Sequence, residues 1–208
     1  MGYFPFFMDL SGVEGLIVGG GITALRKIEK MLPYGPRLTV VSPDFHQRLA
    51  TLSGLTLICQ TFSEELLEGK EFVIAATDDS DLNHKISDLC RQRRIPVNVV
   101  DDKAYCTFLF PALVQQGDLS IGISTGGASP SAAIYLKKQI SALIPENMEE
   151  LLAYLEAQRE TVKSAFPAES LRGAVFKQLF LASLEKRRPL CGEETESILQ
   201  KFKEAESR

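Results

Sequence analysis

Short apolar runs separated by turns and amphipathic segments fill the first half of the chain, a pattern that predicts alternating strands and helices. The run 72–76 is continuously apolar, as expected for a parallel strand that helices cover on both faces. Helices are expected after the first strand, over 63–67 and over 81–93. The predicted strands lie at 16–18, 38–41, 55–58, 72–76 and 96–100. We therefore expect an α/β fold with a parallel sheet and right-handed crossovers.

The pattern changes in the second half of the chain. Residues 119–124 alternate between apolar and polar positions and predict a sixth strand, which a helix over 131–143 follows. No strand pattern follows Pro145, so a small all-helical C-terminal domain is expected. Its predicted helices lie at 149–166, 174–186 and 193–206. At the other end, the apolar stretch Tyr3–Met8 is expected to be an edge strand of the first domain or a lead-in to it.

A glycine-rich turn follows the first predicted strand and has the pattern Gly19-x-Gly21-x-x-Ala24. This is the dinucleotide-binding fingerprint of Rossmann-like domains with alanine at its third position. Gly19 permits a tight turn, Gly21 allows backbone to approach a pyrophosphate, and Ala24 lets the helix pack close to the strand. The N-terminus of that helix favours the negative charge of the phosphates. A glycine turn in an ordinary α/β domain is the alternative.

Polar residues follow the other predicted strands. Ser42-Pro43-Asp44 ends the second strand, where an acidic residue is expected to bind the adenosine ribose. No arginine follows at once to receive a 2′-phosphate, which favours NAD over NADP. Asp44 is equally explained as the cap of a following helix. Thr77-Asp78 and Asp101-Asp102 end two further strands, where ligands bind in such sheets.

A second strand, glycine turn and helix occur at Thr125-Gly126-Gly127-Ala128-Ser129-Pro130. Backbone N–H groups, hydroxyls and a helix N-terminus would suit an anionic ligand there. Ser129 as N-cap with Pro130 at the first helical position explains the same residues structurally, and both interpretations are compatible.

Composition excludes several function classes. The chain has 208 residues and a net charge of −4, which is not the basic excess of a nucleic-acid binder. No apolar run is long enough to span a bilayer, and the first ten residues lack the features of a secretory signal. The four cysteines are scattered without a C-x-x-C pair, which favours a reduced cytoplasmic protein without a structural zinc site or other metal centre.

Several motifs occur together in a specific order, and this ordered set resembles the precorrin-2 dehydrogenase family, the dehydrogenase/ferrochelatase module of siroheme synthase. The resemblance covers essentially the whole chain. The sequence contains no counterpart of the methyltransferase domain that some siroheme synthases carry, so it is similar to the stand-alone form of the family. The motifs are Pro5-Phe6, Gly19-Gly20-Gly21 with Ala24-x-Arg26-Lys27, Ala75-Ala76-Thr77-Asp78, Asn98-Val99-Val100-Asp101, Phe108-x-x-Pro111 and Thr125-Gly126-Gly127-x-Ser129-Pro130.

The resemblance implies that precorrin-2 is oxidised to sirohydrochlorin with NAD⁺ as the hydride acceptor. Some members of the family also insert Fe²⁺ to make siroheme, and others do not. It further implies a homodimer with exchanged helices. The expected domains are an NAD-binding Rossmann-like domain at 1–112, a dimerisation segment at 113–146 and a helical C-terminal domain at 147–208.

The resemblance also assigns residues. The catalytic aspartate of the family corresponds to Asp101, and a turn or cap aspartate better explains Asp102. The NAD-contacting positions correspond to Gly21, Ile22, Thr23, Pro43 and Asp44. The glycine fingerprint adds Gly19, and the strand-end argument adds Thr77 and Asp78. Thr125 stands where some relatives carry a phosphorylated serine. For the polycarboxylate substrate, the candidates are Thr125, Gly126, Gly127, Ser129, Lys103, Lys137 and Lys138, with a solvated helix face as the alternative for the paired lysines.

Three functional hypotheses remain open from the sequence. The first is the dehydrogenase, and the second adds iron insertion to it. The third is a non-catalytic NAD-sensing dimeric regulatory module, which would have no need of Asp101. His84 is expected to be a surface histidine rather than a metal ligand, since the chain has two histidines without ligand spacing.

Overall fold

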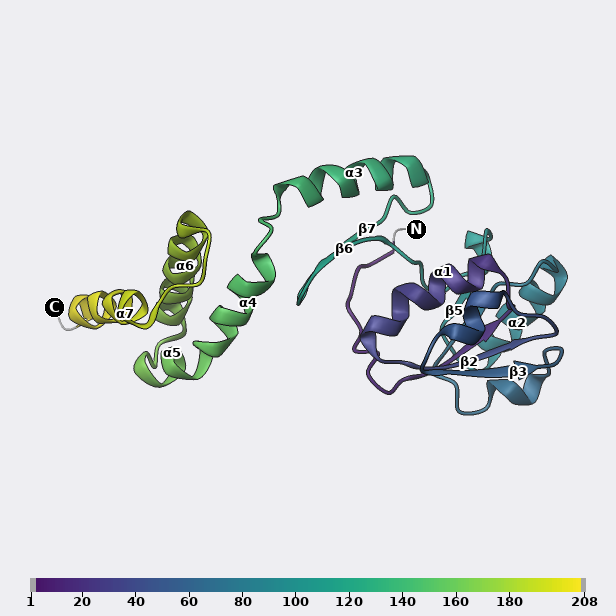
Figure 1. Ribbon diagram of the computed structural model, residues 1–208. Coiled ribbons are helices and arrows are strands. Elements are labelled where there is room, and N and C mark those ends of the chain that lie inside the picture. Colours follow the sequence, from purple (N-terminus) through teal and green to yellow (C-terminus); the bar gives the residue numbers. More distant parts are fainter. Residues whose placement is uncertain (1–2, 207–208) are drawn as a thin grey trace. The chain divides into compact units, whose positions relative to one another are not determined.

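The computed structural model describes residues 3–206. The chain divides into two compact units, Met1–Phe110 and Pro111–Arg208, which are described separately (Figure 1). The expected three-part division, with boundaries after residues 112 and 146, stays a prediction.

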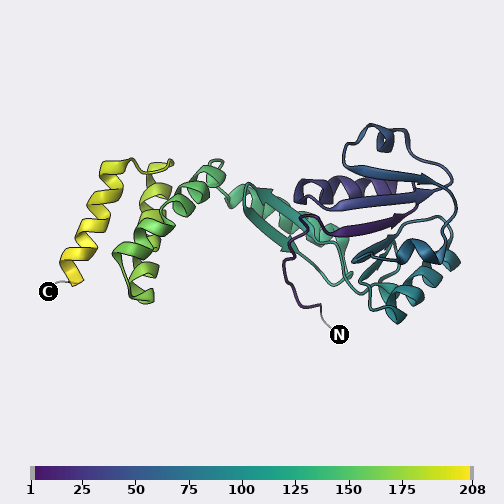
Figure 2. The ribbon, with the colours of Figure 1, turned by 90° about the horizontal axis from the view of Figure 1, so that it is seen from below.

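The first unit is built on a five-stranded sheet in which every neighbouring pair of strands is parallel. The strand order is β3-β2-β1-β4-β5, so β1 lies in the centre with β2 and β4 beside it. Figure 2 shows these strands side by side. The strands are β1 Glu14–Val18, β2 Arg37–Ser42, β3 Leu55–Cys59, β4 Phe72–Ala75 and β5 Val97–Val99. The expected Rossmann-like α/β fold is confirmed.

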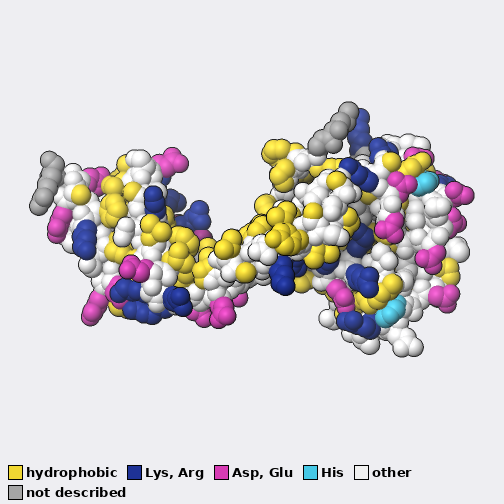
Figure 3. Space-filling model, turned by 90° about the horizontal axis from the view of Figure 1, so that it is seen from above, with side chains coloured by type: hydrophobic (Ala, Val, Ile, Leu, Met, Phe, Trp, Pro, Cys, Tyr) yellow, Lys and Arg dark blue, Asp and Glu magenta, His cyan; other side chains and the backbone are white. Residues whose placement is uncertain are grey.

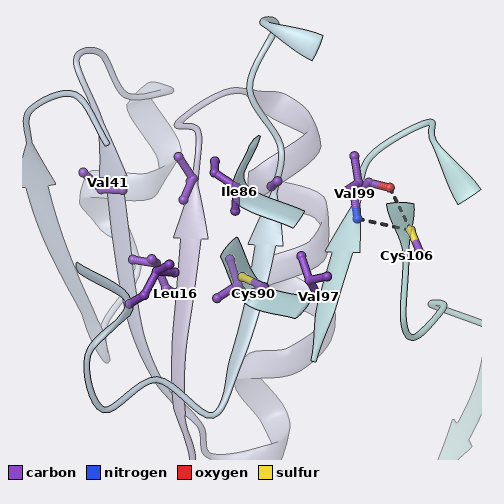
Figure 4. Close-up of a cluster of buried hydrophobic side chains, with 11 residues drawn as sticks. Leu16, Val41, Ile86, Cys90, Val97, Val99 and Cys106 are labelled. Atoms are coloured by element: carbon purple, nitrogen blue, oxygen red, sulfur yellow. Dashed lines mark hydrogen bonds between the residues drawn. The ribbon is translucent and has the colours of Figure 1, made fainter. Parts of the chain in front are cut away.

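Two helices cover the two faces of this sheet. Alternate residues of a strand point to opposite faces: Ile17 and Ile74 pack with α1 (Ile22–Met31), whereas Leu16 and Val73 pack with α2 (Ser80–Gln92). Figure 4 shows the cluster on the α2 face. β4 is apolar and buried at all four positions because both of its faces are covered. Short 3-10 helices complete the unit at Leu32–Tyr34, Gln47–Thr51, Glu64–Leu67 and Lys103–Tyr105.

The apolar stretch Tyr3–Met8 forms no strand, so the expected edge strand is wrong and only the lead-in remains. Pro5 cannot donate a hydrogen bond to a neighbouring strand, which disfavours pairing at this point. Phe4, Phe6 and Phe7 are 84%, 69% and 75% exposed. The segment therefore leaves a row of aromatic side chains on the surface.

The second unit begins with an antiparallel hairpin and continues as helices. A single helix was expected over 149–166, but the structure has two, which meet at Gln158. Phe166, Val162 and Leu179 are completely buried and form the centre of the helical core. The elements are β6 Ala112–Gln116, β7 Leu119–Ile123, α3 Pro130–Leu143, α4 Met148–Ala157, α5 Arg159–Ala165, α6 Glu169–Lys186 and α7 Gly192–Glu206.

The helical core makes a direct prediction about stability. Leu179 is 0% exposed and Leu181, on the same helix, is 45% exposed. Leu179→Ala should lower the free energy of unfolding by about 2–5 kcal/mol, because it leaves a cavity in the core. Leu181→Ala, the matched control, should lower it by about 1 kcal/mol or less. Urea unfolding followed by circular dichroism measures both values, and equal losses would contradict the assigned core.

Candidate functional site

A cavity of about 530 Å³ opens at the carboxyl ends of the parallel strands in the first unit. The loops after β1, β2, β3 and β4 contribute to it, as expected for a ligand site in a sheet of this kind. The lining residues are Val18, Gly19, Gly20, Gly21, Val41, Ser42, Pro43, Asp44, Phe45, His46, Gln60, Thr61, Phe62, Ala76, Thr77, Asp78, Asp79 and Leu82.

Two glycines shape the cavity in different ways. Gly19 has φ +115, and a Cβ at this position would collide with the Ala76 carbonyl oxygen at the end of β4. Gly21 is the N-cap of α1, where no side chain caps the helix and a Cβ would project into open space. The first N–H groups of α1 are therefore accessible to an anion, and the helix dipole favours its negative charge. This open backbone fits a dinucleotide pyrophosphate.

Most of the predicted cofactor residues come together in this cavity. Gly19, Gly21, Pro43, Asp44, Thr77 and Asp78 all line it. Ile22 and Thr23 begin α1 directly after Gly21 but are not among the lining residues.

Asp44 does not cap the helix that follows it. The N-cap of the 3-10 helix Gln47–Thr51 is His46, whose Nδ1 accepts a hydrogen bond from the Arg48 N–H at 3.3 Å. The capping alternative for Asp44 is therefore wrong. Asp44 instead lines the cavity.

Asn83 holds the loop after β4 in place. Its Oδ1 accepts hydrogen bonds from the Thr77 N–H at 3.2 Å and the Thr77 hydroxyl at 2.8 Å, and its Nδ2 donates to the Thr77 carbonyl at 2.9 Å. Asn83 is 5% exposed, so these bonds compensate for its burial. The sequence analysis missed these hydrogen bonds, because in the sequence Asn83 is only a polar residue of a predicted helix.

The sequence analysis also missed the part of the cavity wall formed by Gln60, Thr61 and Phe62. These residues directly follow β3, whose carboxyl end meets the same edge as the others. The rule about strand ends applies to them too, and it would have identified them had it been extended to the third strand.

Asp101 follows β5 at the same edge of the sheet but is not among the residues that line the cavity. Its φ of +58 lies in the left-handed region, which aspartate tolerates better than most residues. Its side chain is exposed. A left-handed non-glycine residue held in a loop next to a ligand site is a candidate for function.

The residues after Asp101 are firmly attached to the fold. Asp102 caps the following 3-10 helix by accepting a hydrogen bond from the Ala104 N–H, as its cap interpretation predicts. Its other oxygen lies 2.9 Å from His84 Nε2 on α2. The His84 ring in turn stacks on Tyr105, with ring centroids 3.7 Å apart. His84 is thus a structural partner of the loop.

Cys106 closes the same loop against β5. Its Sγ donates to the Val99 carbonyl at 3.2 Å and accepts from the Val99 N–H at 3.1 Å, as the dashed lines in Figure 4 show. Burial raises the pKa of the Cys106 thiol, so it stays neutral near pH 7. Asp101 therefore lies in a short segment that β5 and Cys106 hold at both ends.

The second predicted turn belongs to the second unit. Thr125 Oγ1 accepts a hydrogen bond from the Ser129 N–H and donates one to the Ser129 carbonyl. Ser129 is the N-cap of α3, with Pro130 at the start of the helix, which confirms the structural interpretation of this turn. Gly126 and Gly127 have positive φ, and Lys137 and Lys138 are exposed on α3. Their role in binding a substrate stays a prediction.

Two further features are absent from residues 3–206. No helix there is long and apolar enough to cross a membrane. Within the same residues, no group of three or more His, Cys, Asp or Glu side chains could hold a metal ion.

Comparisons with curated proteins find siroheme synthases. The chain is 39% identical to the siroheme synthase of Thioalkalivibrio sulfidiphilus (strain HL-EbGR7) over 182 residues, which cover 86% of this chain and 37% of that protein. It is 36% identical to the siroheme synthase of Pseudomonas entomophila (strain L48) over 205 residues, which cover 96% of this chain and 44% of that protein. The chain thus spans less than half the length of these relatives.

A solved structure and a family model also match. The structure called "SirC, precorrin-2 dehydrogenase" matches with a TM-score of 0.74 and 24% identity, covering 97% of this chain and 100% of that one, which shows a shared fold. The family model described as "Putative NAD(P)-binding" matches residues 6–112, just over half of the chain and nearly all of the first unit. The chain belongs to this NAD(P)-binding family.

Proposed function

We propose that the chain is an NAD-dependent dehydrogenase that oxidises precorrin-2 to sirohydrochlorin. The observation that carries the proposal is the shared edge of the sheet, where the carboxylate of Asp101 follows β5 and the dinucleotide cavity lies at the ends of β1 to β4. The names of the siroheme synthases and of the precorrin-2 dehydrogenase that the chain resembles support the substrate.

We assign the cavity to NAD rather than NADP. Asp44 lies on its wall after β2, where an acidic side chain suits the ribose hydroxyls of NAD. Among the described residues that line the cavity, none is Lys or Arg, the cations that a 2′-phosphate would need. Gly19, Gly21, Ile22, Thr23, Pro43, Thr77 and Asp78 complete the proposed cofactor site.

The proposed role of Asp101 is that of a proton acceptor. Oxidation of the macrocycle breaks a C–H bond whose hydride the nicotinamide accepts when bound, and the substrate also loses a proton. An ionised carboxylate at the edge of the sheet can accept that proton. Lys103, Lys137 and Lys138, with the turn Thr125–Ser129, are the proposed partners of the substrate carboxylates.

We further propose that residues 113–146 form a homodimer interface, with 1–112 as the NAD-binding domain and 147–208 as the helical domain. Three consecutive side chains of α3, Ile134, Tyr135 and Leu136, are 65%, 63% and 43% exposed. Figure 3 shows hydrophobic side chains gathered on this part of the surface.

The cytoplasm is the proposed location of the protein. The four cysteines form no disulfide, which suits that reducing compartment.

Gly21→Ala should weaken NAD⁺ binding about ten-fold or more, because the methyl group projects into the space where the pyrophosphate approaches the backbone. Gly173→Ala is the matched control, since a Cβ there also meets open space but lies on α6 in the other unit. Isothermal titration with NAD⁺ measures both affinities. Equal affinity in the Gly21 variant and the wild type would contradict the pyrophosphate site.

Asp101→Ala should reduce NAD⁺-dependent formation of sirohydrochlorin by about 10²-fold or more while NAD⁺ still binds, because the proton acceptor is lost. Asp88→Ala, which removes an exposed carboxylate from α2, should keep full activity. The absorbance of product over time measures turnover. Unchanged turnover in the Asp101 variant would remove this residue from the mechanism. A wild-type protein that binds NAD⁺ without consuming precorrin-2 would instead favour the regulatory module.

Replacement of both Ile134 and Tyr135 by Asp should convert the dimer to monomers of 23.0 kDa, because two charges would be buried in the apolar interface. Ser131→Asp adds a charge at the exposed start of the same helix and should leave the dimer intact. Light scattering after size-exclusion chromatography gives the masses. A monomeric wild-type protein would refute the proposed interface.

A further inference from the structure

The segment that follows β5 is held by hydrogen bonds before and after Asp101. Before it, the Val100 N–H donates a hydrogen bond to the Ala75 carbonyl of β4 at 3.0 Å. After it, Asp102 Oδ1 accepts a hydrogen bond from the Ala104 N–H at 3.1 Å. Asp101 lies between these anchored neighbours with φ +58. A left-handed conformation costs free energy at a residue with a side chain, so the surrounding contacts must maintain it.

One face of α2 supplies further contacts to the residues after β5. The Ser87 hydroxyl donates a hydrogen bond to the Tyr105 carbonyl at 2.7 Å, and Arg91 Nη2 donates one to the Ala104 carbonyl at 3.0 Å. His84 lies on the same face of the helix, because positions 84, 87 and 91 are three and four residues apart. α2 therefore supports this segment at several points.

His84 contacts the residue directly after Asp101. Its Nε2 donates a hydrogen bond to Asp102 Oδ2 at 2.9 Å, while the other carboxylate oxygen accepts from the backbone. The side chains of His84 and Asp102 are 31% and 35% exposed, so both are mostly shielded from solvent. The His84 ring also stacks on Tyr105, with ring centroids 3.7 Å apart and an angle of 8° between the rings.

The two contacts of His84 act at different places in the segment. The hydrogen bond fixes the residue next to Asp101, whereas the stacked ring fixes Tyr105, which lies further along. A general base must lie within hydrogen-bond reach of the proton that it accepts, and a displacement of about 1 Å can lower a rate about 10²-fold. The hydrogen bond is therefore the contact better placed to control the position of the Asp101 carboxylate.

We propose that His84 is a positioning residue for Asp101 and acts through its hydrogen bond to Asp102. In this role His84 touches no substrate and transfers no proton. The inference rests on the proposed function, in which Asp101 accepts a proton from the substrate. The support that His84 gives to the segment is a property of the protein alone and is measured without substrate.

Three variants separate the contacts of His84. His84→Gln keeps an N–H donor that can reach Asp102 but removes the ring, whereas His84→Phe keeps a ring that can stack on Tyr105 but removes the donor. Lys85→Ala is the matched control on the same helix, because it removes only an exposed ion pair with Glu64 at 3.3 Å.

His84→Phe should lower kcat for NAD⁺-dependent formation of sirohydrochlorin about ten-fold and leave the Kd for NAD⁺ unchanged, because the dinucleotide cavity is intact. His84→Gln should retain at least half of the wild-type kcat, and Lys85→Ala should match the wild type. An amide cannot exchange a proton as an imidazole does, so an active His84→Gln also excludes a catalytic role for the ring. Equal kcat values in the two His84 variants would overturn the proposal.

A second comparison tests whether His84 acts through Asp101. In the Asp101→Ala protein, adding His84→Phe should cause no further loss of the residual activity, because the carboxylate to be positioned is already gone. A further ten-fold loss would show an effect that is independent of Asp101 and would contradict the proposal.

The last measurement needs no substrate. The hydrogen-bonded amides of Ala104 and Cys106, followed by NMR, should exchange with solvent about ten-fold faster in His84→Phe than in the wild type, and at nearly the wild-type rate in His84→Gln. Faster exchange throughout the first unit would indicate general destabilisation and would contradict the proposal. If exchange changes as expected but the wild-type protein does not oxidise precorrin-2, the proposed function fails while the support of the segment by His84 stands.

Discussion

The parallel register of five strands is the constraint on which the first unit depends. Because every strand runs the same way, the chain leaves each strand at one edge of the sheet, and residues far apart in sequence meet there. β1 is central, and Val18 pairs with both Val41 and Ala75. The close approach of β1 and β4 continues one residue further, where Gly19 passes the Ala76 carbonyl so tightly that a side chain would collide. Both the pairing of the sheet and the shape of the cavity therefore require a residue without a side chain at position 19.

Rigid support beneath the loops is the second feature of this edge. Asn83 fixes the loop at Thr77 through three hydrogen bonds, and Cys106 fixes the segment after β5 through the backbone of Val99. Loops that carry function are placed precisely when buried groups of the scaffold hold them. In this chain the supporting groups come from α2 and from the return of the chain along β5, so each loop is anchored to an element that the core already fixes.

The first unit also contains two residues in unfavourable environments or conformations. Lys27, which donates a hydrogen bond to Asn98, is partly buried and has no carboxylate within salt-bridge distance among residues 3–206. Asp101 adopts a left-handed backbone conformation outside any helix cap. Natural proteins depart from the rules of stable packing chiefly at functional sites. Both departures lie beside β5, which makes this end of the sheet a candidate for function in addition to the glycine turn.

The sequence by itself determined the order of the five strands and two α-helices of the first unit, the glycine turn before α1, and six residues of the cavity wall, because these depend on local periodicity and on strand ends. It could not decide whether Asp44 lies at the cofactor site or caps the next helix, since both interpretations suit an acidic residue after a strand, and only the path of the backbone makes His46 the cap. It could not show that the apolar stretch at Phe4 and Phe6 stays unpaired, since pairing depends on a neighbouring strand. Nor could it reveal that Lys27 is partly buried, since a lysine in a helical pattern is normally predicted to face solvent. Only the tertiary structure brings this lysine against Asn98 and Phe110, because burial is a property of the assembled layers rather than of any one segment.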